Sequence, residues 1–184
     1  QKLNQPESCA AYYLKAIPIA ENVKDTLRLI ILYNNISALY SNKPADSLLF
    51  FQYANGALRL SELTGSLYDK GIALTNIGEF YSKSNNPNAL TNYHSAINAF
   101  GTLPGFESQQ VYTHQLTAEY YAKTKLFDST AYYYHQALQL ANKYTDTFGI
   151  VKSQLGLAQL NIRKGNNKEA IEMLNKTIEP ARKN

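Results

Sequence analysis

Three pairs of side chains recur in this sequence at an interval of 40 residues and could take part in recognition. In each pair an acidic or amide residue stands four positions before a basic one, and the pairs are Glu79 with Lys83, Glu119 with Lys123, and Gln159 with Arg163. On a helix such a pair shares one face and stabilises the helix by roughly a few tenths of a kcal/mol. Alternatively, a residue repeated once per copy forms a row along a groove, where it meets a partner.

No catalytic or metal-binding constellation is visible among the other reactive residues. His94, His114 and His135 have neither a cysteine nor a close carboxylate beside them, so a zinc site is not expected. Cys9 is the single cysteine, which excludes an internal disulfide and a thiolate zinc cluster. The glycines form neither a phosphate loop nor a dinucleotide-binding motif. We therefore predict a protein that is not an enzyme, without metal or cofactor, although a helical array can carry a site that no motif reveals.

The composition disfavours nucleic acid and membranes as partners. The net charge of +4 arises from 18 basic and 14 acidic side chains, scattered without a block of one sign. Arginine occurs only four times, which is too few for a platform that stacks single-stranded nucleic acid. No apolar run approaches the roughly 20 residues of a membrane helix, so direct membrane insertion of this segment is not expected. Only 17% of the residues are charged, so much of the polar surface must consist of uncharged groups such as amides. Such a surface favours an extracytoplasmic protein.

A small-large-small rhythm indicates the elements that position these residues. Its members lie four and seven residues apart, hence on one helical face, and they are Cys9, Tyr13 and Ala16; Ala89, Tyr93 and Ala96; Thr130, Tyr134 and Ala137; and Ala170, Leu174 and Thr177. Comparable small positions recur every 39 to 41 residues, at Ala16, Ala57, Ala96, Ala137 and Thr177. The chain therefore opens on the second helix of an incomplete copy, as an excised fragment would.

The rhythm and its punctuation predict an all-α fold of about nine antiparallel helices, an α-α superhelix without strands. We expect helices near 7–20, 22–42, 45–63, 67–84, 87–100, 107–124, 127–143, 147–164 and 167–181. They would form a single repeat domain over 1–184, with a partial repeat at 1–20 and repeats at about 22–63, 67–100, 107–143 and 147–181. No loop is long enough to be a domain linker.

Tyrosines are dense in "EYYAKTKLFDSTAYYYHQAL" (119–138), and we interpret them as packing residues rather than as a stacking platform. A small residue on one helix lets its neighbour approach, and a tyrosine one turn further along fills the gap beside it. Tyr132 and Tyr133 cannot both share the face of Tyr134. At least one of them should be exposed or contact the next repeat.

The stretch "GIALTNIGEFY" (71–81), followed by "ALTNYHSAINAF", resembles a tetratricopeptide repeat (TPR). Ile77-Gly78-x-x-Tyr81 matches the family's first-helix signature, and Ala89, Tyr93 and Ala96 match that of its second helix. The spacing of about 40 is similar to the long-repeat type in bacterial regulators and kinesin-light-chain-like adaptors. The last copy departs from the pattern, because Leu155-Gly156 and Leu157-Ala158 offer two competing registers.

The resemblance implies that partner peptides lie along the first helices, in the concave groove of the superhelix. Polar residues of these helices are therefore candidate ligand-binding residues, with Asn42 at the place that Lys83 and Lys123 take in later copies. They are Asn34, Asn35, Asn42, Asn76, Glu79, Lys83, Gln115, Glu119, Lys123 and Arg163.

Two kinds of signalling protein agree with these features. The first is a non-enzymatic protein- or peptide-binding scaffold, the periplasmic sensor region of a bacterial signal-transduction protein such as a histidine kinase. The alternative is a cytoplasmic peptide-responsive transcriptional regulator or adaptor. The sequence also leaves a homodimer open, because an array that ends between helices exposes an apolar face.

Overall fold

The computed structural model describes residues 5–41, 44–102 and 104–182, and within these residues the fold is all-α, without strands. The helices are α1 (Gln5–Asn22), α2 (Thr26–Tyr40), α3 (Ser47–Thr64), α4 (Leu67–Lys83), α5 (Asn88–Gly101), α6 (Glu107–Lys123), α7 (Phe127–Lys143), α8 (Thr147–Lys164) and α9 (Asn167–Arg182). A short 3-10 helix, Pro44–Asp46, precedes α3. The predicted all-α class with nine α-helices is confirmed for this part of the chain.

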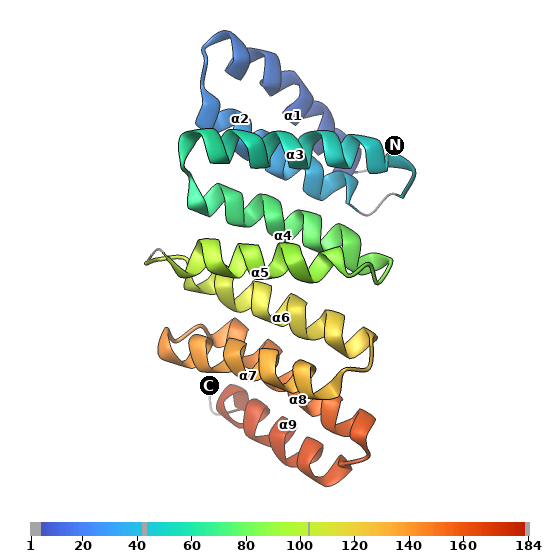
Figure 1. Cartoon of the computed structure of the whole chain (residues 1–184). Helices are drawn as coiled ribbons and strands as arrows, with labels where there is room; N and C mark the ends of the chain where they lie inside the picture. The colour runs from blue at the N-terminus through green and yellow to red at the C-terminus, as the bar shows by residue number, and fades with distance from the viewer. Residues whose placement is uncertain (1–4, 42–43, 103, 183–184) are drawn as a thin grey trace. The chain divides into compact units, whose positions relative to one another are not determined.

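The chain divides into two compact units, Gln1–Ala99 and Phe100–Asn184, which we describe separately. Unit 1 holds α1 to α4 and nearly all of α5, and unit 2 holds α6 to α9 (Figure 1). Consecutive helices pack against each other from α1 to α4 in unit 1 and from α6 to α9 in unit 2. We call α2, α4, α6 and α8 first helices and α1, α3, α5, α7 and α9 second helices. First helices of successive repeats also touch, α2 with α4 and α6 with α8.

Turns with a left-handed residue separate the helices at regular intervals. Such residues recur every 40 positions between repeats, at Gly65, Gly105 and Thr145, and every 40 within repeats, at Asn85, Lys125 and Gly165. Lys24 (φ 55°) is another, and Asp25 after it accepts a hydrogen bond from the Arg28 N–H at 2.9 Å. The prediction that a helix begins near residue 22 was therefore wrong, because this turn delays α2 to Thr26.

Small side chains at the helix crossings let aromatic residues fill the core of unit 1. Ala54 and Ala57 on α3 are fully buried, and Phe50, also fully buried, stacks on Phe80 of α4 with ring centroids 4.3 Å apart. Gly78 lies so close to the Tyr93 ring of α5 that a β-carbon there would be 2.6 Å from it. The predicted packing of a large residue of one helix beside a small residue of its neighbour is thus observed in this unit.

The core of unit 2 repeats this arrangement with smaller residues. Ala137 packs with Val111, and Ala118 packs with Tyr134 and Leu157, all of them buried. The expected rhythm of Thr130, Tyr134 and Ala137 is confirmed, since all three are buried.

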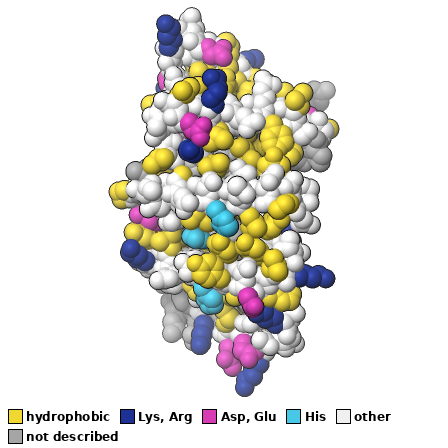
Figure 2. Space-filling view, in the orientation of Figure 1, with side chains coloured by type: hydrophobic (Ala, Val, Ile, Leu, Met, Phe, Trp, Pro, Cys, Tyr) yellow, Lys and Arg dark blue, Asp and Glu magenta, His cyan; other side chains and the backbone are white. Residues whose placement is uncertain are grey.

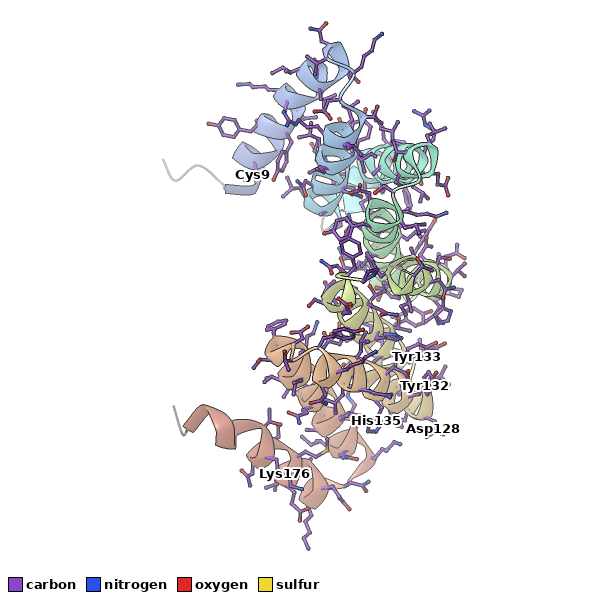
Figure 3. The ribbon with its side chains drawn as sticks, turned by 90° about the vertical axis from the view of Figure 1, so that its left-hand side faces the viewer. Cys9, Asp128, Tyr132, Tyr133, His135 and Lys176 are labelled. Atoms are coloured by element: carbon purple, nitrogen blue, oxygen red, sulfur yellow. The ribbon has the colours of Figure 1, made fainter. Side chains whose placement is uncertain are left out.

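The consecutive tyrosines of helix α7 differ in how deeply they are buried. Tyr132 is 57% exposed, whereas Tyr133 stacks on Tyr121 of α6 with ring centroids 5.5 Å apart. Figure 3 labels Tyr132 and Tyr133 on α7. The prediction that at least one of these two neighbours is exposed or contacts the next repeat is confirmed by Tyr132.

On the face seen in Figure 2, hydrophobic side chains are interspersed with charged side chains of both signs. Among the described residues, no helix combines the length and apolar character needed to cross a membrane.

Candidate functional site

Polar side chains on the first helices of unit 1 link α2 to α4. The Asn34 side-chain amide donates to the Asp69 carbonyl oxygen at 3.4 Å, and the Asn76 amide donates to the Asn34 carbonyl and the Ser37 hydroxyl, both at 3.2 Å. These amides are therefore already hydrogen-bonded to the protein. A peptide would have to exchange these bonds to use their amide hydrogens.

In unit 2 a side-chain amide likewise links the first helices α6 and α8 by hydrogen bonds. The Gln115 side chain is almost fully buried, and its Nε2 donates to the Gly149 carbonyl at 3.0 Å and to the Ser153 hydroxyl at 2.9 Å. A buried amide left without these partners would cost free energy, so Gln115 fixes how α8 docks on α6.

Basic residues of the recurring pairs reach back to the preceding first helix. Lys83 Nζ donates to the carbonyl oxygen of Ser41, the C-cap residue of α2. Arg163 Nη1 donates to the carbonyl oxygen of Ala122 in the last turn of α6, at 3.1 Å. Carbonyl groups at a helix C-terminus lack partners within the helix and carry partial negative charge, so a cation there is favourable.

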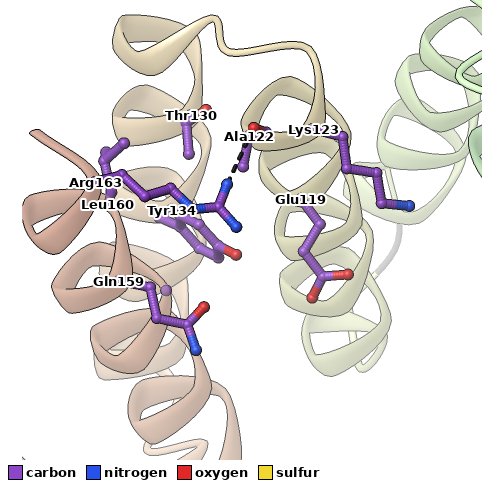
Figure 4. A pocket seen from close by; sticks show the side chains of 9 residues that line it. Glu119, Ala122, Lys123, Thr130, Tyr134, Gln159, Leu160 and Arg163 are labelled. Carbon is purple, nitrogen blue, oxygen red and sulfur yellow. Dashed lines mark hydrogen bonds between the residues drawn. The ribbon is translucent and has the colours of Figure 1, made fainter.

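A pocket of about 160 Å³ lies in unit 2 between α6 and α8, with α7 behind it (Figure 4). Two of the recurring pairs meet in it, and its lining residues are Glu119, Ala122, Lys123, Thr130, Tyr134, Gly156, Gln159, Leu160 and Arg163. Four of these residues, those of the two pairs, were singled out in the sequence. The helical repeat thus brings together, from adjacent first helices, side chains that are 40 residues apart.

Charges of both signs face this pocket. The Glu119 carboxylate lies 3.3 Å from Lys152 Nζ of α8, so its nearest described cation comes from the next first helix. In Figure 4 the Lys123 ammonium points away from Arg163, whose guanidinium lies beside the Tyr134 hydroxyl. The pocket therefore combines a hydrogen-bond acceptor on α6 with donors on α7 and α8.

Tyr134 of α7 lines this pocket with its phenol group. Its side chain is 6% exposed, its hydroxyl points into the space between Arg163 and Glu119, and it makes no hydrogen bond to the described residues (Figure 4). Burial raises the pKa of Tyr134 to about 12, with a further increase from the Glu119 charge and an opposing effect of Arg163. The phenol is therefore protonated at neutral pH and able to donate.

Gly156 allows the Tyr134 ring to lie against α8. A β-carbon at Gly156 would be 2.2 Å from Tyr134 Cζ, closer than any real contact. Ala158 is fully buried, like Ala118 at the equivalent place 40 residues earlier, whereas Leu155 is exposed. The register of the last copy is therefore Leu157-Ala158, and Gly156 serves the tyrosine of the preceding helix.

The other candidate residues are distributed along the first helices. Asn35 is exposed on α2, and Glu79 is half-buried on α4. Asn42 lies outside the described residues. Sequence reasoning assigned Thr130 and Tyr134 to packing and Gly156 to a repeat signature, and it named none of the three as a candidate binding residue. In the observed Leu157-Ala158 register the repeat signature places no glycine at 156, and this departure is the signal that an aromatic ring from another helix needs the space.

Metal ligands are not grouped in the described residues, where no three His, Cys, Asp or Glu side chains could hold one ion. His94 and His135 are both exposed.

Comparison with family models gives a match to the C-terminal part of the chain. Residues 104–182 match the model described as the SusR N-terminal TPR domain, which is a repeat domain and not a catalytic family. The comparison with curated proteins found no match. The match covers α6 to α9 and the pocket between them. The resemblance to tetratricopeptide repeats is thereby confirmed, and residues 104–182 are similar to the SusR N-terminal TPR domain.

Proposed function

We propose that this chain is a non-enzymatic, peptide-binding repeat module and the sensor region of a bacterial signal-transduction protein. The observation that carries the proposal is the pocket at α6 and α8, where two recurring pairs and the Tyr134 hydroxyl converge in the segment that matches a SusR-type TPR domain. For the whole protein we favour a histidine kinase, with this module as its sensor region in the periplasm.

The first helices supply a rigid support for an extended ligand. Gln115 and Arg163 bind the two first helices of unit 2 to each other through buried and terminal hydrogen bonds. The pocket geometry is therefore formed before a ligand arrives, which lowers the entropic cost of binding. Asn35, Glu79 and Lys83 offer further polar contacts within unit 1.

Peptide selection tests this function directly. A phage-displayed library of random linear peptides is panned on the purified chain, and the enriched peptides are synthesised and titrated into the isotope-labelled protein. We expect amide shifts to concentrate on α6 and α8 around Gln159 and Arg163. Shifts confined to the exposed face of α7 around Tyr132, or the absence of any enriched peptide, would contradict the proposal.

The cellular role has a separate test. The complete gene is fused to reporters that are active only outside or only inside the cytoplasm, and the domain that follows the repeats is identified. Activity of the periplasmic reporter is expected. Activity of the cytoplasmic reporter would instead favour the alternative, a cytoplasmic peptide-responsive regulator.

A further inference from the structure

The Tyr134 side chain is mostly buried, but its hydroxyl faces the pocket, where water or a ligand can reach it. A donor at this place is satisfied by water or by a polar group of a ligand. Here the hydroxyl faces a pocket of about 160 Å³, whereas one water molecule needs roughly 10–15 Å³ of such space. The space is therefore large enough for a polar side chain and its methylene groups.

The two walls of this pocket differ in hydrogen-bonding character. On the α6 side, Glu119 uses one carboxylate oxygen for Lys152, and a carboxylate has a second acceptor oxygen. On the opposite side, Arg163 donates one N–H to the carbonyl oxygen of Ala122, and a guanidinium carries five such donors. A complementary group accepts hydrogen bonds at one end and donates them at the other.

We propose that this pocket recognises the primary carboxamide of an Asn or Gln side chain in the partner peptide. The carboxamide oxygen accepts from the Tyr134 hydroxyl and the Arg163 guanidinium, while its NH₂ group donates to Glu119. Leu160 and the methyl groups of Ala122 and Thr130 line the rest of the pocket and accommodate the methylene stem. This inference rests on the proposed peptide-binding function and names the side chain that the peptide must supply.

Charged side chains of similar size match the pocket less well. A carboxylate would meet the Glu119 carboxylate and leave its acceptor unused, and an ammonium would meet the Arg163 guanidinium. An aliphatic side chain would bury Tyr134 and Arg163 donors without partners, which is the most effective basis for rejecting a ligand.

Blocked amino acids provide probes of this chemistry without a known partner. N-acetyl methylamides of glutamine, glutamate, lysine and norleucine are titrated into the labelled protein at constant ionic strength, and the Gly156 amide signal is followed. We expect the glutamine probe to bind at least fivefold more tightly than the other three. Equal binding of the four probes, or binding of none of them, would overturn the inference.

Two variants connect the preference to named atoms. Tyr134→Phe retains the ring and should weaken the glutamine probe about tenfold with no effect on the norleucine probe. Glu119→Gln should reverse the order of the glutamine and glutamate probes, because the repulsion of a carboxylate is removed. Glu172→Gln on α9 makes the same charge change at an exposed residue outside the pocket and should leave the order intact. An unchanged order in Glu119→Gln refutes the assignment.

The outcome separates this inference from the peptide-binding function on which it rests. Selected peptides that bind at α6 and α8 and tolerate replacement of their Asn and Gln residues would refute carboxamide recognition and leave the peptide function standing. Binding of free L-glutamine without binding of any selected peptide would refute the peptide function and support carboxamide recognition of a small molecule.

Discussion

Replacing Gly156 by alanine tests how α8 accommodates the Tyr134 ring. The added β-carbon would lie 2.2 Å from Cζ and 2.4 Å from Cε1 of that ring, so the ring or the helix must move. Forcing an extra carbon into a packed core costs about 1 to 3 kcal/mol, whereas alanine in place of glycine within a helix gains about 1 kcal/mol. We therefore expect Gly156→Ala to lower the free energy of unfolding by up to about 2 kcal/mol.

A double-mutant cycle isolates the clash. Leucine at position 134 lacks the outer ring atoms that the new β-carbon would meet, so Gly156→Ala in a Tyr134→Leu background should stabilise the protein by about 1 kcal/mol. The coupling between the two sites is then about 1 to 3 kcal/mol, measured by urea unfolding followed by circular dichroism.

A matched control uses another helical glycine. The nearest atom to a β-carbon at Gly101 belongs to the movable Gln110 side chain, at 2.8 Å, so Gly101→Ala should be neutral or stabilising in either background. The reasoning is refuted if Gly156→Ala is as well tolerated as Gly101→Ala and its effect adds to that of Tyr134→Leu without coupling.

Other perturbations probe the link between first helices, the turns and the phenol. Gln115→Ala removes two buried hydrogen bonds to α8 and should lower the free energy of unfolding by about 2 to 4 kcal/mol; a loss below about 1 kcal/mol in urea unfolding would contradict this role. Thr145→Gly relieves a left-handed residue with a branched side chain (φ 56°), and a higher melting temperature is expected, a lower one being the contrary result. Because its folded-state pKa of about 12 exceeds the ordinary value, Tyr134 stabilises the fold fully below pH 10 and loses this contribution as the pH rises through 12. Tyr134→Phe should therefore remove the most alkaline phase of the ultraviolet tyrosinate titration, and a titration identical to the wild type would disprove the assignment.

The local pattern of the sequence was sufficient to predict the helices. Amphipathic periodicity, the small-large-small rhythm and turns every 40 residues depend on residues near each other in the chain, and the observed α3 to α9 follow the predicted ranges within a few residues. The start of α2 was missed because Lys24, which has no special backbone preference, adopts a left-handed conformation that sequence does not signal.

The candidate site was predictable only in part. The interval of 40 residues identified Glu119, Lys123 and Arg163 and implied that they lie on neighbouring first helices. It did not indicate that Glu119 pairs with Lys152. This pairing depends on the rotation of α8 about its axis, which the packing of Gln115 against Gly149 and Ser153 determines.

The sequence by itself determined the helices and the regular recurrence of their residues. Both are local properties, because helix geometry depends on residues that are close together in the chain. Only the tertiary structure decided that Tyr134, a packing residue by its pattern, places its hydroxyl in a pocket. The ring crosses to α8 at Gly156, so its environment depends on how two helices of successive repeats approach each other. That approach results from buried area, hydrogen bonds and excluded volume summed over both helices, and no short stretch of sequence contains it.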